Sequence, residues 1–193
     1  MIPIQWKQND KKTMHVNEAE NGVVYLTWPA IEKIEGIRHA FSTRIGGVSK
    51  EHLSSMNLSF SRGDDPANVR ENYRRFCEAA GFEVENIVTS DQAHTTKVRY
   101  VTKADCGSGV TRDRDFHDID GMITDEPGVV LATFYADCVP LYFVDPVHRV
   151  IGLSHSGWRG TVHKMGQVTL DAMHERFGTE AKDVIAAVGP SIC

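Results

Sequence analysis

The sequence lacks the features that mark secreted and membrane-spanning chains. Its first residues, MIPIQWKQNDKK, contain no apolar core of a secretory signal. The most apolar run covers residues 128–136, ends at Asp137 and is far too short to span a bilayer. We therefore expect a cytoplasmic protein that makes no use of a membrane.

Cysteine is scarce and unpaired. The chain has no Cys-x-x-Cys motif and only four cysteines, namely Cys77, Cys106, Cys138 and Cys193. In a chain of this length without a secretory signal, such a pattern is typical of free thiols in a reducing compartment. A cysteine of functional importance is then expected to act through metal or nucleophilic chemistry.

An excess of basic charge is also missing. Lys and Arg number 21 against 26 Asp and Glu, for a formal net charge of −5. This balance argues against nucleic acid or an anionic membrane as the main partner. A hydrophobic content of 41% with 24% charged residues is typical of a soluble globular protein. No repeat or linker divides residues 1–193, which we interpret as one domain.

Two helices are predicted. Asp65 suits an N-cap, Pro66 the first helical position and Gly81 the C-terminal stop. The first helix is expected to turn four side chains inward, namely Val69, Tyr73, Phe76 and Ala80. A second helix is predicted over residues 162–177, ended by Gly178, with four more inward side chains, namely Val162, Met165, Met173 and Phe177.

Short apolar segments predict many strands. They cover residues 23–29, 37–44, 87–89, 97–102, 121–124, 129–135, 141–144 and 150–154. Together with two well-separated helices, they indicate an α+β domain with a mixed, largely antiparallel sheet core and flanking helices. The final apolar strand runs into a Gly-Pro turn just before the chain stops, so we expect a domain truncated at its C-terminus.

Two apolar segments carry soft ligating side chains near their ends. Cys138 lies between an aspartate and a Val-Pro pair, where a strand frays, although a small buried thiol is the alternative. His155 precedes a Ser-Gly-Trp-Arg-Gly turn, although a hydrogen-bonded core imidazole is the alternative. If strands 129–135 and 150–154 are neighbours, their carboxyl ends bring Cys138 and His155 together.

A third candidate ligand is His94, in the segment QAHTTKV between two short strands. An exposed loop histidine explains this segment equally well. Two imidazoles and a thiol would form the three-ligand set by which catalytic zinc is usually held, with water in the fourth position. Their separations in the sequence match no short-range metal motif, so the spacing by itself is a weak signal.

Arginines beside glycine-containing turns are candidate anion-binding residues. Arg44 precedes Ile-Gly-Gly, and Arg159 follows Trp158 at an expected helix start, where backbone N–H groups favour anions. Tyr135, Phe134 and Trp158 are candidate stacking partners for a planar ligand, although core packing is the expected use of Phe134.

Several segments in one order resemble the laccase-domain family. They are HAFSTRIGGVSK, NLSFSRGDDPANVRENYRRF, QAHTTKV, DGMITDEPGVVLATFYADCVPLYFVDP, IGLSHSGWRGTV and VGPSI. The similarity runs from about residue 37 to the end of the chain. Members of this family are known as polyphenol oxidases and as purine nucleoside phosphorylases with adenosine deaminase activity, and they usually carry several dozen more residues after GPSI.

The resemblance implies a zinc site formed by the His of QxH, the Cys of ADC and the His of HSGWRG, which are His94, Cys138 and His155 here. These three would be both metal ligands and catalytic residues, with Arg44 and Arg159 binding substrate or anion. It implies a fold distantly similar to bacterial cysteine-hydrolase toxins. The implied reaction is phosphorolysis of adenosine, inosine, guanosine and methylthioadenosine, together with adenosine deamination.

Three other functions stay open at this point. One is a metal-independent hydrolase with Cys138 as nucleophile and His155 as base. A second is a copper-dependent phenol oxidase, although the His-x-His pairs of a multicopper cluster are missing from the sequence. The third is a non-enzymatic protein with a structural metal. The sequence makes no prediction of the oligomeric state.

Overall fold

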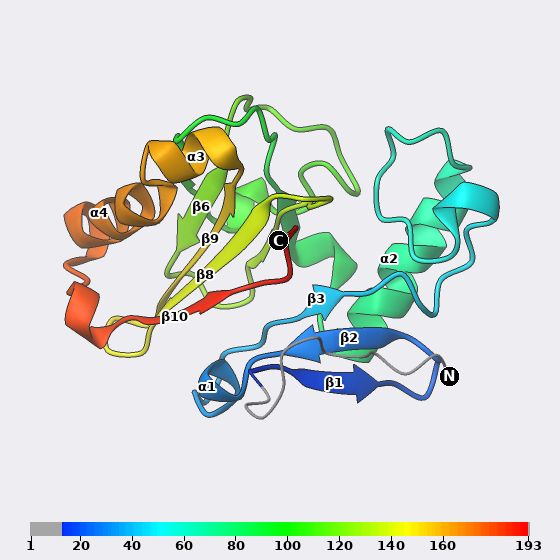
Figure 1. Cartoon of the computed structure of the whole chain (residues 1–193), viewed down its shortest axis with the longest axis horizontal. Coiled ribbons are helices and arrows are strands. Elements are labelled where there is room, and N and C mark those ends of the chain that lie inside the picture. Colours follow the sequence, from blue (N-terminus) through cyan, green and yellow to red (C-terminus); the bar gives the residue numbers. More distant parts are fainter. Residues whose placement is uncertain (1–12, 193) are drawn as a thin grey trace.

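A five-stranded sheet lies at the centre of the computed structural model, which describes residues 13–192 (Figure 1). Its order is β10-β8-β9-β6-β5, from β5 (Val98–Tyr100), β6 (Gly121–Thr124), β8 (Val139–Asp145), β9 (Val150–Ser156) and β10 (Ile185–Val188). The pairs β10–β8, β8–β9 and β9–β6 are antiparallel, whereas β5–β6 is parallel. The predicted α+β class with a mixed, largely antiparallel sheet is confirmed.

Two smaller sheets flank the central one. The first is antiparallel and contains β1 (His15–Glu18), β2 (Val24–Thr27) and β3 (Phe41–Ser42). The second is the parallel pair of β4 (Ile87–Thr89) and β7 (Val130–Ala132). The strand predicted over 23–29 stops early because Pro29 begins helix α1 (Pro29–Glu32), a position that suits proline. The strand predicted over 37–44 was too long, and β1 was not predicted.

Helix α2 (Pro66–Ala80) confirms the first helix prediction. The Asp65 carboxylate accepts a hydrogen bond from the Ala67 N–H at 2.8 Å, and Gly81 ends the helix in the left-handed region at φ 74°. The buried face is rotated from the predicted one, because Asn72 and Cys77 are buried while Phe76 and Ala80 are only half-buried. Asn72 turns inward because its side-chain amide bonds the Val48–Asn57 segment, namely Val48, Ser49, Ser55 and Asn57.

The second predicted helix is two helices, α3 (Trp158–Val162) and α4 (Met165–Phe177). Lys164, in the left-handed region at φ 59°, separates them. Val162 is 67% exposed, so its predicted inward position was wrong, whereas Met165 and Met173 are buried as predicted. Short 3₁₀ helices complete the described secondary structure, at η1 (Glu51–Leu53), η2 (Val84–Asn86), η3 (Lys103–Asp105) and η4 (Ala181–Asp183).

Apolar side chains cover both faces of the central sheet. Helix α4 packs against one face through a cluster that contains Ile123, Phe143 and Met173. On the other face, Val144 and Ala187 pack with Trp28 and Ile31 of the α1 region. Burial on both faces explains why β8 and the first four residues of β9 are nearly continuous apolar runs. The sheet is therefore a rigid support for residues at its ends.

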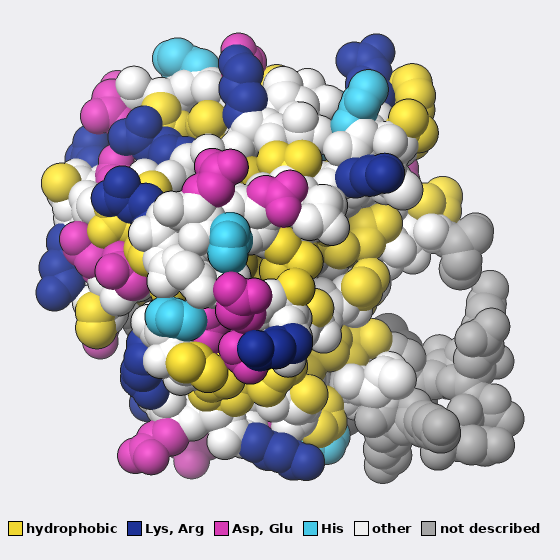
Figure 2. All heavy atoms as spheres, turned by 90° about the vertical axis from the view of Figure 1, so that its left-hand side faces the viewer, with side chains coloured by type: hydrophobic (Ala, Val, Ile, Leu, Met, Phe, Trp, Pro, Cys, Tyr) yellow, Lys and Arg dark blue, Asp and Glu magenta, His cyan; other side chains and the backbone are white. Residues whose placement is uncertain are grey.

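Acidic and basic side chains are mixed on the surface (Figure 2), and the described cysteines are free thiols, as the sequence predicts. Figure 2 shows basic and acidic side chains interspersed on the face that carries α4. Cys77, Cys106 and Cys138 are free thiols, and Cys193 lies outside the described residues. Within residues 13–192, every helix is too short or too polar to cross a membrane. The similarity to cysteine-hydrolase toxins stays a prediction.

Removal of the α2 cap gives a test of this fold. Asp65→Ala should lower the free energy of unfolding by about 1 kcal/mol, since one N-terminal N–H of the helix loses its acceptor. Urea unfolding followed by circular dichroism measures the change. Asp113→Ala, at an exposed loop aspartate, is the control and should change the free energy by less than about 0.5 kcal/mol. Equal unfolding midpoints for the two variants would contradict the capping role.

Candidate metal centre

Cys138 and His155 meet across the pair of β8 and β9. Cys138 directly precedes β8, and His155 is the next-to-last residue of β9. The antiparallel register places Pro140 opposite His155, so the start of one strand lies beside the end of the other. The predicted route was wrong, because the strand at 130–132 pairs with β4 in a separate sheet and is not a neighbour of β9 in a ladder.

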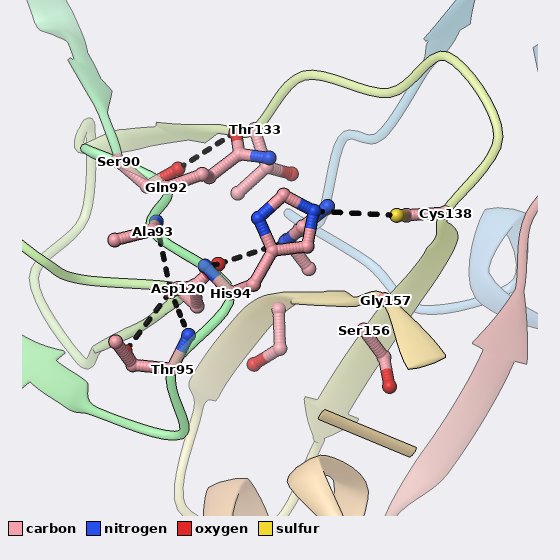
Figure 3. A network of polar contacts seen from close by, with 12 residues as sticks. Ser90, Gln92, Ala93, His94, Thr95, Asp120, Thr133, Cys138, Ser156 and Gly157 are labelled. Atoms are coloured by element: carbon pink, nitrogen blue, oxygen red, sulfur yellow. Dashed lines mark hydrogen bonds and ion pairs between the residues drawn. The ribbon is translucent and has the colours of Figure 1, made fainter. Parts of the chain in front are cut away.

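His94 reaches the same place from the loop between β4 and β5. Its backbone lies in the left-handed region at φ 59°, and its Nε2 is 3.8 Å from the Cys138 Sγ. Its ring meets the His155 ring edge to face, with centroids 4.9 Å apart. Figure 3 shows the His94 imidazole directed at the sulfur of Cys138. One ligating atom from each of the three residues lies within 4.8 Å of the others.

These separations suit a single metal ion. With Zn–S near 2.3 Å and Zn–N near 2.0 Å, tetrahedral ligands should have sulfur and nitrogen about 3.5 Å apart. The observed 3.8 Å between Cys138 Sγ and His94 Nε2 differs from that by a few tenths of an ångström. His155 is buried, Cys138 half-buried and His94 exposed, so the cluster opens to solvent on the His94 side. Three donors and one open side suit a metal that binds a further ligand.

A buried carboxylate, Asp120, joins the two histidines. Its Oδ1 accepts a hydrogen bond from the His155 Nδ1 at 2.8 Å and from the His94 N–H at 3.1 Å. Its Oδ2 accepts from the N–H groups of Ala93 and Thr95 and from the Thr95 hydroxyl (Figure 3). The Asp120 carbonyl also accepts from the His155 N–H at 2.7 Å. The loop that carries His94 is thereby folded around one carboxylate.

The electrostatics of Asp120 fix the tautomer of His155. Burial raises the pKa of Asp120, but the hydrogen bonds from His155 and from the Thr95 and Ala93 backbone outweigh it and lower the pKa to about 2. The carboxylate is therefore ionised and accepts the proton on His155 Nδ1. The lone pair of His155 is then on Nε2, which is the usual arrangement for a histidine that ligates a metal.

Cys138 has the opposite electrostatic environment. Burial raises the pKa of its thiol, and the carboxylates of Asp137 and Asp120 raise it further. A thiol in such surroundings is mostly protonated at neutral pH and is a poor free nucleophile. The same negative surroundings favour a cation, which would deprotonate the thiol on binding.

Gly157 makes room for the cluster. Its φ of −74° is open to any residue, so backbone strain does not explain the glycine. A Cβ at this position would lie 2.8 Å from the His94 Cδ2 and 3.0 Å from the Cys138 Sγ. The first distance is shorter than real Cβ contacts, and the second is tighter than most of them. The glycine is therefore required by the close approach of two ligand side chains to the backbone between β9 and α3.

The cluster lies on the wall of an open groove of about 1900 Å³. Arg44 lines the same groove and donates through Nε and Nη2 to the Ser54 carbonyl, at 2.9 and 2.6 Å. Arg159 is exposed on α3 with its guanidinium 5.4 Å from the Trp158 ring centre, and neither residue is among the described residues that line the groove. The structure thus brings Arg44, but not Arg159, to the groove of the three candidate ligands.

Sequence reasoning missed two residues of this site. Asp120 precedes the buried strand β6 in the segment Asp-Ile-Asp-Gly, and an acidic residue just before an apolar strand was the available signal. Gly157 lies in the turn that the sequence predicts after His155, but no local feature shows that a side chain would be blocked there. Both residues position the candidate ligands and supply no metal-ligating atom of their own.

An α+β protein with a candidate His-Cys-His metal site is the class that this fold and cluster define. Residues 38–193 match the family described as multi-copper polyphenol oxidoreductase laccase, and the chain belongs to this family. The family assignment made from the sequence is confirmed.

Relatives in this family carry names of nucleoside enzymes. Purine nucleoside phosphorylase YlmD of Bacillus subtilis is 36% identical over 156 residues, which cover 79% of this chain and 55% of the relative. Human purine nucleoside phosphorylase LACC1 is 36% identical over 157 residues, which cover 80% of this chain and 34% of that protein. The chain therefore spans about half the length, or less, of these relatives.

Solved structures of relatives share the fold. The crystal structure of YlmD from Geobacillus stearothermophilus matches with a TM-score of 0.78 at 36% identity, over 87% of this chain and 62% of that one. The structure of Bacillus licheniformis YfiH matches with a TM-score of 0.77 at 31% identity, over 95% of this chain and 64% of that one.

Substitution of Asp120 tests its role as the centre of the hydrogen bonds. Asp120→Asn should lower the free energy of unfolding of the metal-free protein by about 3 kcal/mol, because buried N–H groups lose a charged acceptor. Chemical unfolding in the presence of a chelator measures it. Asp125→Asn is the control, since this exposed carboxylate accepts from the Tyr100 hydroxyl at the surface. A loss no larger than that of the control would refute the role of Asp120.

Substitution of Gly157 tests the packing of the ligands. Gly157→Ala should weaken zinc binding about 10- to 100-fold, because the new methyl group must displace His94 or Cys138. Competition with a chromophoric chelator measures the dissociation constant. Gly166→Ala in α4 is the matched control, because its Cβ would meet Leu141 and Phe143 at ordinary contact distances of 3.7 and 3.9 Å. Wild-type affinity in Gly157→Ala would show that the ligands do not occupy this space.

Proposed function

We propose that this chain carries the metal site of a zinc-dependent purine nucleoside enzyme, which phosphorolyses purine nucleosides and also deaminates adenosine. The supporting observation is the convergence of His94, Cys138 and His155 at the wall of an open groove. The names of the relatives support the substrate class, since YlmD and LACC1 are both called purine nucleoside phosphorylases.

Zinc is favoured over copper by the number and kind of ligands. One thiolate and two imidazoles suit either metal, but three protein donors with an open side are typical of catalytic zinc. Within residues 13–192 this is the one cluster of three or more such side chains close enough to hold an ion. A multicopper oxidase needs several copper ions, whereas residues 13–192 supply one such cluster. The described residues therefore favour a hydrolase or phosphorylase that uses a single metal ion.

Each residue of the site has an assigned part. His94, Cys138 and His155 would hold the ion, and zinc, when bound, supplies a Lewis acid for phosphate or water. Asp120 keeps the proton of His155 on Nδ1. We assign Arg44 to donate a hydrogen bond to the phosphate. Two of its nitrogens already donate to the Ser54 carbonyl, which holds the guanidinium in place, and a further N–H is left for the phosphate.

The groove wall supplies the surface for the nucleoside. Phe41 and Tyr135 both line the groove, with ring centroids 6.1 Å apart, and are the assigned apolar contacts of the purine. In phosphorolysis a phosphate oxygen forms a bond to C1′ of the ribose while the bond from C1′ to the purine nitrogen breaks, and the base leaves with a proton. In deamination a water oxygen adds at C6 of adenine and ammonia leaves.

A metal-independent Cys-His hydrolase is less well supported. Such an enzyme needs a thiol of lowered pKa beside its base. Burial and two nearby carboxylates instead raise the pKa of Cys138. The bond from His155 Nδ1 to Asp120 leaves Nε2 free and is compatible with either function, so the pKa of the thiol decides between them. Both the zinc enzyme and the metal-independent hydrolase require a reduced thiol at Cys138. This requirement supports the expectation of a cytoplasmic protein.

Loss of the thiolate ligand tests the proposed function. Cys138→Ser should lower the zinc content of freshly purified protein from about one ion per chain to below about one tenth, and abolish phosphate-dependent release of free base from inosine and adenosine. Elemental analysis and chromatography of the products measure the two effects. Cys106→Ser, at a thiol outside the cluster, is the control and should retain both. Zinc and base release unchanged in Cys138→Ser would refute the proposal.

A further inference from the structure

The segments that carry His94 and Cys138 leave the same end of one small sheet. Strands β4 and β7 are parallel, and their last paired residues are Thr89 and Ala132. One more backbone hydrogen bond follows, from the Ser90 N–H to the Ala132 carbonyl at 3.1 Å. Beyond it, the two segments continue outside any strand until β5 and β8 begin. The ladder therefore ends before it reaches either candidate ligand.

The side chain of Gln92 continues the ladder where the backbone stops. Its Nε2 donates to the Phe134 carbonyl at 2.7 Å, and its Oε1 accepts from the Phe134 N–H, also at 2.7 Å. The Ser90 hydroxyl donates to the same Oε1 at 3.1 Å. One primary amide thus pairs with both backbone groups of Phe134, as a strand residue would. Figure 3 shows Gln92 between the His94 segment and Thr133.

The three candidate ligands are not held in the same way. His155 and His94 are both tied to Asp120, through Nδ1 and the backbone N–H respectively. Cys138 instead borders β8, where Val139 pairs with Ser156 of β9, and the segment that leads to it is tied to the His94 loop through Phe134 and Gln92. Gln92 is two residues from His94, and Phe134 is four residues from Cys138. The amide is therefore the direct bridge between the loop of one ligand and the segment of another.

We propose that Gln92 is a positioning residue of the metal centre, whose amide sets the separation of the Cys138 thiol from His94. This inference rests on the proposed metal site and assigns a role to a side chain that ligates nothing. Because Asp120 holds the histidine pair independently, loss of the Gln92 amide affects the sulfur ligand first. A residue that only stabilised the fold would affect all three ligands alike.

The experiment compares Gln92→Met with wild type. Methionine keeps the length of the side chain and removes both hydrogen-bonding groups. Gln167→Met is the matched control, since the Gln167 amide bonds Asp171 within the exposed surface of α4. For each protein, three quantities are measured. They are the zinc dissociation constant by chelator competition, the thiolate-to-metal charge-transfer absorption of the cobalt(II) form, and hydrogen exchange of residues 133–138 without metal.

We expect Gln92→Met to bind zinc about tenfold more weakly, to lose most of the thiolate absorption of bound cobalt, and to exchange faster at the Phe134 amide. Gln167→Met should match wild type in all three. Ser90→Ala, which removes one bond to the amide and keeps the pair with Phe134, should show the same changes at reduced size. It serves in place of Gln92→Met if that variant does not fold.

Two results would overturn the role of Gln92. One is wild-type affinity and thiolate absorption in Gln92→Met. The other is faster exchange at Phe134 with metal binding unchanged, which would show that the amide orders the segment without placing the ligand. Failure of the proposed function itself is distinguishable, because wild-type protein would then bind neither zinc nor cobalt through its thiol.

Discussion

The hydrogen bonds of Asp120 are the interaction on which the rest of the site depends. A buried carboxylate is stable only where donors replace its water, and here those donors come from the His94 loop and from His155. These bonds fold the His94 loop and fix the tautomer of the His155 imidazole. The carboxylate itself adds negative charge near the Cys138 thiol. The negative charge of the carboxylate lowers the free-energy cost of bringing a cation there. The backbone of Asp120 is held on both sides, since its N–H donates to the Lys97 carbonyl and its carbonyl accepts from the His155 N–H.

The central sheet makes this arrangement reproducible. Strands β8 and β9 pair over seven residues, and apolar clusters pack on both faces of their sheet. That register brings the residue before β8 beside the end of β9. Elements that form the site thus fall into two kinds. His155 is part of a rigid strand, whereas His94 and Cys138 lie in loops that side-chain amides and carboxylates tie together.

Local signals in the sequence predicted local structure well. The Asp-Pro start and Gly stop of α2, and the bounds of strands β4 and β6, are confirmed because caps and short apolar runs are properties of a few adjacent residues. Strand pairing is a long-range property, and for that reason the sequence did not decide whether strands 129–135 and 150–154 are neighbours, which they are not. The three candidate ligands were named from the sequence, whereas Asp120 was not, because an aspartate before a strand has no local feature that separates a buried hydrogen-bond acceptor from an ordinary turn residue.

The proposed centre holds one ion through one sulfur and two nitrogens, from His94, Cys138 and His155, with an open side for substrate. Zinc K-edge absorption spectroscopy of the purified chain tests this most directly, because it reports the kind and distance of each ligand atom. We predict one sulfur at about 2.3 Å and two imidazole nitrogens at about 2.0 Å, with the remaining ligand a light atom from solvent. A first shell without sulfur, or one closed by four protein ligands, would contradict it.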